Sequence, residues 1–274
     1  MIIGVPKEIK NHEYRIGLTP AGVKELVVNG HHVIVENNGG AAIGFENEQY
    51  ITAGAKIIDS AAEIFATADM IIKVKEPQPI ECKMLRPGQV LFTYLHLAPD
   101  PKQTELLVAS GATCIAYETV TQNGGGLPLL APMSEVAGRM SIQAGAHALE
   151  KAQGGLGALL GGVPGVAPAK VLIVGGGVVG TQAARMAVGM GADVTILDRS
   201  LPRLRQLDTE FDGRLKTVYS TADAMDQLIV EADLVIGAVL IPGAAAPKLV
   251  TAEHIKMMKK GAVIVAVSYT HLTL

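Results

Sequence analysis

The chain has 274 residues, a net charge of −3 and only 4% aromatic residues, with two cysteines and no tryptophan. This length predicts two domains, and the charge excludes the basic surface that binding to a nucleic acid or a membrane surface requires. Cys82 and Cys114 lie far apart without metal-ligand spacing, so we expect reduced thiols and no metal. We also expect no signal peptide and no membrane span, and therefore a soluble, cytoplasmic protein.

The first half of the chain alternates short apolar segments with amphipathic ones. Strands are expected at 2–5, 32–36, 56–58, 70–75, 89–95 and 113–118. Helices are expected at 20–29, 47–53 and 101–110, with a further one beginning at Ser60. This alternation predicts a parallel sheet with helices on both faces, in which ligands gather at the carboxyl ends of the strands.

Glycine and proline are concentrated at 121–132, where we place the boundary between domains 1–130 and 131–274. A long helix is expected to begin at Ser134. Parallel strands are expected at 170–174, 193–197, 215–219, 233–239 and 262–267, with helices at 178–190, from 221 and at 251–260. We predict an α/β protein of two doubly wound parallel-sheet domains. The second is a Rossmann domain with five of the usual six strands, incomplete at its C-terminal end.

The second domain contains a dinucleotide-binding signature. An apolar strand leads directly into Gly175, Gly177 and Gly180, which have the spacing G-x-G-x-x-G. The first glycine permits a tight turn, the second lets a pyrophosphate approach the backbone, and the third lets the helix pack against the strand. Asp198 ends the next strand, where a carboxylate binds an adenosine ribose, and its charge favours NAD over NADP. The alternative is a purely structural glycine turn.

Three side chains of the first domain are candidates for chemistry. Arg15, in a polar loop after the first strand, would hold a carboxylate through two parallel hydrogen bonds. Lys75 ends a strand and would bond a carbonyl or carboxylate oxygen, and His96 titrates near neutrality, as a general acid or base does. Taken singly, each is more often a solvated charge or, for His96, a group that satisfies local backbone. Arg203 also has two alternatives, a contact with the adenosine side of a cofactor and a surface charge.

Several segments together closely resemble the bacterial L-alanine dehydrogenase family, and the resemblance covers roughly residues 1–267. The segments are MIIGVPKEIKNHEYRIGLTP, IIKVKEP, LFTYLHLA, APMSEVAGRMSIQAGAHALEK and VLIVGGGVVGTQAARMAVGMGADVTILD. The resemblance implies that Arg15 and Lys75 bind the carboxylate and keto oxygen of the substrate, and that His96 is the catalytic acid and base. It implies further cofactor contacts, beside the glycines of the turn, at Ser134, Val178, Val179, Asp198, Arg203, Ser220, Val239 and Leu240.

The implied activity is the reversible, NAD-dependent oxidative deamination of L-alanine to pyruvate and ammonium, in L-alanine catabolism. Domain 1–130 would bind the substrate and domain 131–274 would bind NAD. The resemblance also implies a homo-oligomer, a hexamer in the family.

The last residues depart from the family pattern. Members of the family continue the last strand as GAVIVDVAIDQGG, with a second catalytic group in the later aspartate, whereas this chain reads GAVIVAVSYTHLTL. Ala266 and Thr270 therefore occupy the two aspartate positions. We expect the chain to be a fragment, or its last seven residues to be non-native, and its activity to be weak or absent.

Three alternatives remain. The NAD-binding portion of a proton-translocating transhydrogenase shares the fold and has a similar N-terminal sequence, but it would not need Arg15, Lys75 and His96. Saccharopine dehydrogenase uses a comparable site on a larger substrate. A non-catalytic NAD-binding protein would explain the missing aspartate.

Overall fold

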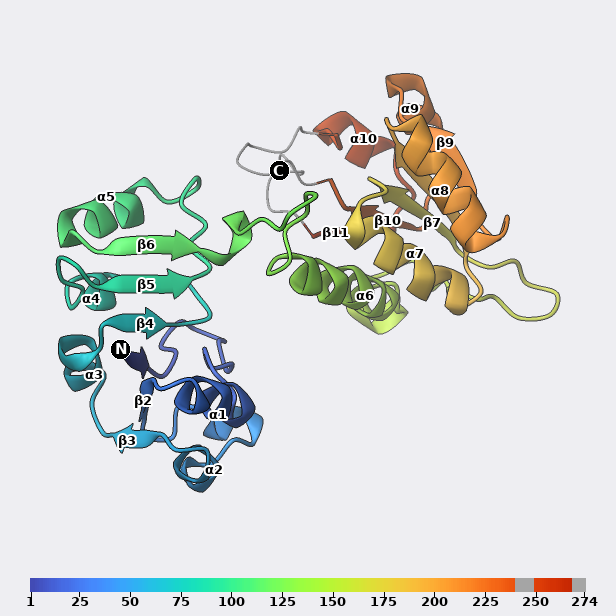
Figure 1. Ribbon diagram of the computed structural model, residues 1–274. Coiled ribbons are helices and arrows are strands. Elements are labelled where there is room, and N and C mark those ends of the chain that lie inside the picture. Colours follow the sequence, from blue (N-terminus) through green and yellow to red (C-terminus); the bar gives the residue numbers. More distant parts are fainter. Residues whose placement is uncertain (240–248, 268–274) are drawn as a thin grey trace. The chain divides into compact units, whose positions relative to one another are not determined.

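The structure is a computed structural model that describes residues 1–239 and 249–267 (Figure 1). The chain divides into two compact units, Met1–Leu130 and Ala131–Leu274. Each unit has its own parallel sheet and its own hydrophobic core. The predicted fold class, two doubly wound α/β domains, is therefore confirmed.

The first unit contains a six-stranded parallel sheet in the order β3-β2-β1-β4-β5-β6. Its strands are β1 (Ile2–Val5), β2 (His32–Glu36), β3 (Lys56–Ile58), β4 (Met70–Ile72), β5 (Val90–Thr93) and β6 (Thr113–Ala116). Its helices are α1 (Pro20–Val28), α2 (Asn47–Thr52), α3 (Ala61–Thr67), α4 (Pro79–Cys82) and α5 (Pro101–Ser110), with 3₁₀ turns η1 (Ala41–Ile43) and η2 (Tyr117–Thr119). The strand order changes direction between β1 and β4, which is where ligands bind in open parallel sheets.

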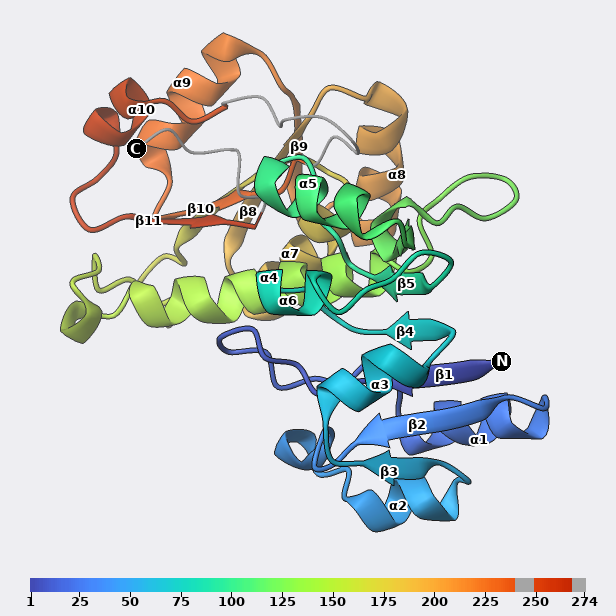
Figure 2. The same cartoon turned by 90° about the vertical axis from the view of Figure 1, so that its left-hand side faces the viewer.

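Both faces of this sheet are covered by helices. Figure 2 shows the helices of one face, α3, α4 and α5. These three helices pack on the face that carries Ile34 and Leu91, whereas α1 and α2 pack on the face that carries Val33 and Val35. The alternation along β2 follows from the two-residue period of a strand. The start of α1 is fixed by a capping side chain: Thr19 accepts a hydrogen bond from the amide of Gly22, as expected for a hydroxyl before proline.

The second unit contains a parallel sheet in the order β11-β10-β7-β8-β9. Its strands are β7 (Lys170–Val174), β8 (Asp193–Asp198), β9 (Lys216–Tyr219), β10 (Leu234–Gly237) and β11 (Val263–Ala266). Its helices are α6 (Ala131–Ala148), α7 (Val178–Gly189), α8 (Leu201–Phe211), α9 (Ala222–Glu231) and α10 (Ala252–Met257), with a 3₁₀ turn η3 (Lys151–Gln153). Helices α6, α7 and α8 cover one face of the sheet, and α9 covers the other.

The sequence-based element assignments differ from the structure in several places. Helix α4 was not predicted, and β5, β6, β10 and α10 are shorter than the predicted 89–95, 113–118, 233–239 and 251–260. Helix α8 was not predicted, although Ser200 caps it and proline follows in its first turn. Helix α6 begins at Ala131, so Ser134 lies inside its first turn and does not open it. Strand β4 ends at Ile72, earlier than the predicted 70–75, because β1 stops pairing with it at Ile71.

No helix among the described residues is both long enough and apolar enough to cross a membrane. Within the same residues, His, Cys, Asp and Glu side chains form no group of three or more that could hold a metal ion.

Candidate functional site

The charged candidates of the first unit lie at the carboxyl edge of its sheet. Arg15 belongs to the loop that follows β1, Lys75 follows β4, and His96 follows β5. Strands β1, β4 and β5 are neighbours in the sheet, so the three loops emerge side by side at the switch in strand order. The topology therefore brings together residues that are far apart in the sequence.

The Arg15 guanidinium is held by a carboxylate from its own loop. Its Nε donates to Glu13 Oε1 at 2.9 Å, and a terminal nitrogen donates to Glu13 Oε2 at 2.6 Å. The hydrogen bond from Arg15 keeps the pKa of Glu13 below its ordinary value of 4.5. The Arg15 side chain remains 46% exposed, so it is oriented but still accessible to a ligand.

Lys75 is a half-buried cation among other charges. Burial is the main reason that its pKa lies below 10.5, and the positive charges of Lys10 and Arg15 lower it further. Its Nζ lies 3.9 Å from Glu76 Oε2. Because the charge of Arg15 acts on Lys75, the two cations belong to one site.

His96 has an unusual backbone conformation and a buried ring nitrogen. Its φ of +49° is in the left-handed region, which non-glycine residues adopt rarely. Its amide donates to Glu118 Oε1 at 2.7 Å, and the amide of Leu95 donates to the same carboxylate. The Nδ1 atom is buried without a hydrogen-bond partner, 3.9 Å from Glu76 Oε2. Nε2 is therefore the ring nitrogen available to a substrate.

The electrostatic environment of His96 favours the neutral imidazole. Burial is the main cause that lowers its pKa below 6.5, followed by the positive charge of Lys75, while Glu118 acts in the opposite direction. A neutral imidazole beside two cations can accept a proton, and the cations can bind a carboxylate. The site is therefore suited to acid–base chemistry on a small carboxylate substrate.

Sequence analysis did not single out the carboxylates that organise this site, Glu13, Glu76 and Glu118. The available signal was position, because Glu76 directly follows Lys75 and Glu118 follows the last strand of the sheet. Lys10 was missed as well; it forms an ion pair with Glu76 and contributes positive charge at Lys75. An ion pair between two loops that are far apart in the sequence cannot be predicted from the spacing of residues.

The glycine turn of the second unit has the geometry that a dinucleotide requires. Gly175 has a φ of +106°, and a Cβ there would lie 2.9 Å from the carbonyl oxygen of Ala238. At Gly180 a Cβ would overlap the carbonyl oxygen of Gly175, whereas at Gly177 it would meet no atom of the described residues within 4 Å. Gly177 thus leaves open space at the N-terminus of α7, where free N–H groups and the helix dipole favour a phosphate.

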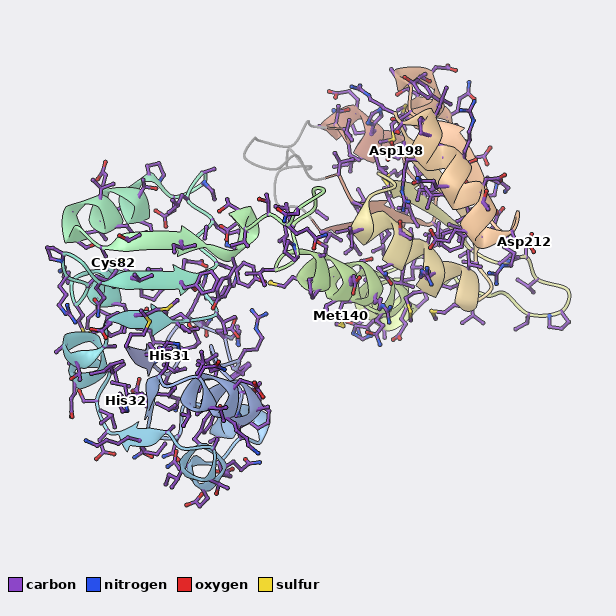
Figure 3. The ribbon with its side chains drawn as sticks, viewed as in Figure 1. His31, His32, Cys82, Met140, Asp198 and Asp212 are labelled. Atoms are coloured by element: carbon purple, nitrogen blue, oxygen red, sulfur yellow. The ribbon has the colours of Figure 1, made fainter. Side chains whose placement is uncertain are left out.

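Asp198 and Arg203 both contact this turn. Asp198, labelled in Figure 3 at the end of β8, accepts hydrogen bonds from the amides of Gly176 at 2.7 Å and Ser200 at 2.7 Å. Arg203 donates from Nε to the carbonyl oxygen of Gly176 at 2.6 Å and from a terminal nitrogen to Thr181 Oγ1 at 2.5 Å. Arg203 is therefore hydrogen-bonded to the glycine turn and holds it in place.

The remaining predicted cofactor positions are distributed around the same edge. Val178 and Val179 form the first turn of α7, Val239 follows β10, and Ser220 donates its amide to the carbonyl oxygen of Asp198. They lie at the carboxyl ends of β7, β10 and β9. Leu240 and Thr270 are outside the described residues.

Ser134 lies at this edge too, as the packing of α6 indicates. A Cβ at Gly138 would overlap the carbonyl oxygen of Val179 in the first turn of α7, whereas Gly145 packs on Leu234 at the start of β10. Helix α6 therefore has its N-terminal part toward the carboxyl edge of the sheet. Ser134, one turn before Gly138, is placed near the start of α7.

A shallow groove lies at the opposite, amino edge of the second sheet. It is lined by the starts of β7, β8 and β9 and by the end of α9. Its charged groups neutralise one another, since Lys170 pairs with Glu231 and Lys216 with Asp193. Ligands of parallel sheets bind at the other edge, so this groove is not the cofactor site.

Comparison with known proteins identifies the family. Residues 4–137 match the family model described as alanine dehydrogenase/PNT, N-terminal domain, and residues 141–271 match its C-terminal domain. The chain is 60% identical to an alanine dehydrogenase of Halomonas elongata and 58% identical to one of Bacillus subtilis. In each case the similarity covers 98% of this chain, and 72% and 70% of the respective relative.

Solved structures agree with these matches. A structure titled L-alanine dehydrogenase superposes with a TM-score of 0.91 at 52% identity, over 97% of this chain and 73% of that one. A transhydrogenase from Sinorhizobium meliloti superposes with a TM-score of 0.81 at 28% identity, over 96% of this chain and 77% of that one. Taken with both family models, these similarities show that the chain belongs to the alanine dehydrogenase/PNT family.

Proposed function

We propose that the chain catalyses the NAD-dependent, reversible oxidative deamination of L-alanine to pyruvate and ammonium. One observation carries the proposal: Arg15, Lys75 and His96 meet at one sheet edge in a chain that is 60% identical to an alanine dehydrogenase. Unit Met1–Leu130 binds the substrate, and the glycine turn of the second unit binds NAD.

The residues of the turn fit the cofactor. Gly177 leaves space for a pyrophosphate, the N-terminus of α7 supplies N–H donors, and Asp198 supplies a carboxylate for the ribose hydroxyls. Ser134, Val178, Val179, Ser220, Val239 and Leu240 complete the proposed contacts, with Arg203 holding the turn. NAD supplies the acceptor for the hydride that leaves the α-carbon of L-alanine.

The side chains of the first unit bind the substrate and move protons. L-alanine, NAD⁺ and water give pyruvate, ammonium, NADH and a proton. Arg15 binds the substrate carboxylate through its planar donors, and Lys75 donates to the oxygen that becomes the keto group. After loss of the hydride, neutral His96 takes a proton from the water that attacks the imine, and returns it to nitrogen as ammonia leaves.

The same proposal includes assembly and location. A homo-hexamer in the cytoplasm, acting in L-alanine catabolism, is what the family resemblance supports. Sedimentation of the purified chain tests the oligomer.

A non-catalytic NAD-binding protein is the second candidate. Ala266 at the end of β11 favours it, because the family pattern has an aspartate at that position and another at position 270. The two candidates differ in turnover and agree in binding NAD.

The test is NADH formation, followed by absorbance, when L-alanine and NAD are added to the purified chain. We expect NADH from L-alanine, none from saccharopine, and loss of the signal in His96→Asn. A Thr270→Asp variant should raise turnover. Tight NAD binding without NADH formation, in both the parent chain and Thr270→Asp, would favour the non-catalytic candidate.

A further inference from the structure

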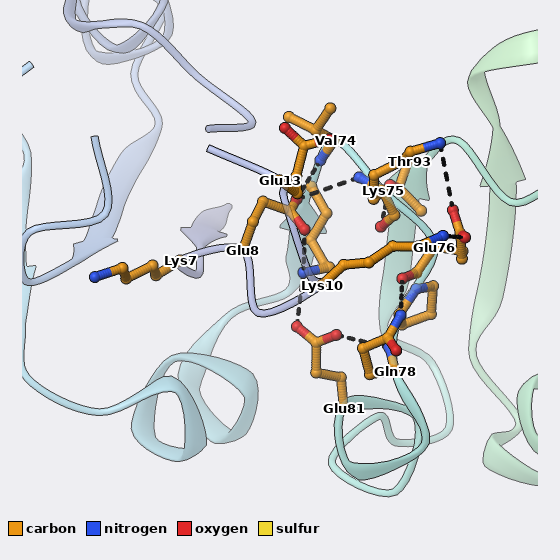
Figure 4. Close-up of polar contacts among 12 residues, drawn as sticks. Lys7, Glu8, Lys10, Glu13, Val74, Lys75, Glu76, Gln78, Glu81 and Thr93 are labelled. Atoms are coloured by element: carbon orange, nitrogen blue, oxygen red, sulfur yellow. Dashed lines mark hydrogen bonds and ion pairs between the residues drawn. The ribbon is translucent and has the colours of Figure 1, made fainter. Parts of the chain in front are cut away.

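Lys73, Glu8 and Glu81 form a buried ion cluster next to Lys75; Glu8, Glu81 and Lys75 are labelled in Figure 4. The Lys73 ammonium lies 3.0 Å from Glu8 Oε2 and 2.6 Å from Glu81 Oε1. The three side chains are 0%, 2% and 3% exposed. No step of the proposed reaction uses them.

Buried ion pairs are weak sources of stability, because removing the charges from water costs about as much as their attraction returns. The attraction between these charges is therefore not by itself a reason for the fold to bury them. A buried cluster with complete hydrogen bonding is better explained by what it holds in place. The contacts of Glu8 indicate what that is.

Glu8 holds the backbone that carries Lys75. Its Oε1 accepts the amide of Val74 at 2.6 Å and the amide of Lys75 at 3.3 Å, while its Oε2 accepts Lys73. On the other side, the buried hydroxyl of Thr93 donates to the carbonyl oxygen of Lys75 at 2.9 Å. Lys75 is thus bound through both its N–H and its C=O group.

The Glu8 carboxylate takes the place of β1 as hydrogen-bond acceptor for the chain that follows β4. Pairing between β1 and β4 ends at Gly4 and Ile71, and the chain leaves β1 at Pro6, which has no amide to donate. The amides of Val74 and Lys75 would otherwise be buried without partners. The Glu8 carboxylate satisfies both, and Lys73 holds that carboxylate in position.

We propose that Glu8, oriented by Lys73, is a positioning residue that fixes the backbone at Lys75 and so places the Lys75 ammonium in the substrate site. The proposal rests on the proposed function for the role of Lys75, but the placement itself is measurable without turnover. Glu81 supplies a matched control, because it pairs with the same Lys73 and contacts no backbone group of Val74 or Lys75.

The first experiment compares Glu8→Gln with Glu81→Gln. Each variant removes one buried carboxylate charge from Lys73, so both should lose similar thermal stability. Only Glu8→Gln should lower kcat/KM for L-alanine, on the order of 100-fold, as misplacement of a substrate-binding group does. In the reverse direction most of the loss should lie in the KM for pyruvate, because that substrate carries the keto oxygen that Lys75 binds, while the affinity for NADH stays unchanged.

The second experiment measures the pKa of the Lys75 amine by NMR titration of labelled protein. Lys75 has a lowered pKa because it is held in a half-buried position. A glutamine at position 8 has one acceptor oxygen, which can face Lys73 or the two amides but not both. Glu8→Gln should therefore release the backbone and move that pKa toward 10.5, and Glu81→Gln should leave it unchanged. Thr93→Val, which adds no buried charge and preserves side-chain shape, should act in the same direction as Glu8→Gln.

Equal changes in Glu8→Gln and Glu81→Gln, in KM and in the Lys75 pKa, would overturn the proposal and leave a cluster that is only structural. An unchanged Lys75 pKa in both Glu8→Gln and Thr93→Val would overturn it as well. If no variant and no parent chain forms NADH, the proposed function fails, whereas the Lys75 titrations still decide the positioning role.

Discussion

The loop after the central strand differs sharply between the two units, although their sheets have corresponding strand orders. β1 is followed by residues 6–19, which contribute Glu8, Lys10, Glu13 and Arg15 to one sheet edge. β7 is followed by Gly175 to Gly177 and then directly by α7. One topology thus presents charged side chains in the first unit and bare backbone N–H groups in the second.

The comparison shows how a ligand site can be changed without changing the sheet. In the second unit the recognition of an anion depends on backbone that must stay free of side chains. A substitution there should therefore act through steric overlap. In the first unit recognition depends on side chains that must be oriented by buried charges. A substitution there should therefore act by changing the electrostatic interactions. The predictions below separate these two kinds of dependence, beginning with the largest expected effect.

Removal of the buried cation should be the most damaging single change in the first unit. Lys73→Met leaves Glu8 and Glu81 buried together without a counterion, which should cost about 3–5 kcal/mol of unfolding free energy. Burial already raises the pKa of Glu81 above 4.5, and Lys73 opposes that rise. The folded variant therefore retains protons that the unfolded chain releases, and its stability should fall as pH rises above 4.5.

Urea unfolding of Lys73→Met at several pH values measures this effect. Lys83→Met, which removes an exposed lysine just after α4, is the control and should change little. A loss of stability in Lys73→Met that does not depend on pH would contradict the electrostatic explanation.

In the second unit, a single methyl group should abolish much of the cofactor affinity. The methyl group of Gly177→Ala meets no atom within 4 Å in the part of the chain that the structure describes, and the backbone there is allowed, so the fold should tolerate it. The methyl group would occupy the space for the pyrophosphate, and the Kd for NADH should rise at least on the order of tenfold, about 1.4 kcal/mol.

Titration of NADH fluorescence gives this Kd. Gly189→Ala, at the other end of α7 and equally open, should leave NADH affinity unchanged. Gly180→Ala should instead lose about 1–3 kcal/mol of stability through overlap with Gly175. Equal NADH affinity in Gly177→Ala and the parent chain would show that the turn does not bind the pyrophosphate.

A change of charge at Glu118 should shift the pH dependence of activity. Glu118 raises the pKa of His96 against the lowering by burial and by Lys75. Glu118→Gln keeps an acceptor for the amides of Leu95 and His96, yet removes the negative charge, so the pKa of His96 should fall further. The acid limb of the kcat/KM profile should therefore move to lower pH, because His96 acts as a neutral base.

The kcat/KM profile of Glu105→Gln, on an exposed part of α5, provides the comparison and should match that of the parent chain. A shift of the acid limb to higher pH in Glu118→Gln would rule out this electrostatic role.

The smallest effect is expected at Glu13. Glu13→Gln breaks a partly exposed pair with Arg15, which should cost less than about 1 kcal/mol. Because Arg15 lowers the pKa of Glu13, that contribution is present above 4.5 and is lost as pH falls below it. Thermal unfolding should thus distinguish the variant from the parent at neutral pH and converge in acid.

The sequence predicted the parts of the fold that depend on local pattern. Thr19 and Pro20 mark the start of α1, and the glycine spacing places the turn before α7, as the structure confirms. Arg15, Lys75 and His96 were predicted as site residues, and the structure brings them to one edge; their roles stay a prediction. The anchoring by Glu8 and Lys73 was missed, because contacts between residues 65 positions apart have no periodicity in the sequence.

The left-handed backbone at His96 determines how this residue should be probed. Alanine at position 96 would bear a penalty of roughly 1–2 kcal/mol for that conformation, so a conventional alanine scan would mix loss of the imidazole with distortion of the chain. Asparagine tolerates left-handed backbone and presents no titrating group. The backbone conformation alone therefore limits which residue types can occupy position 96, independently of any requirement of catalysis.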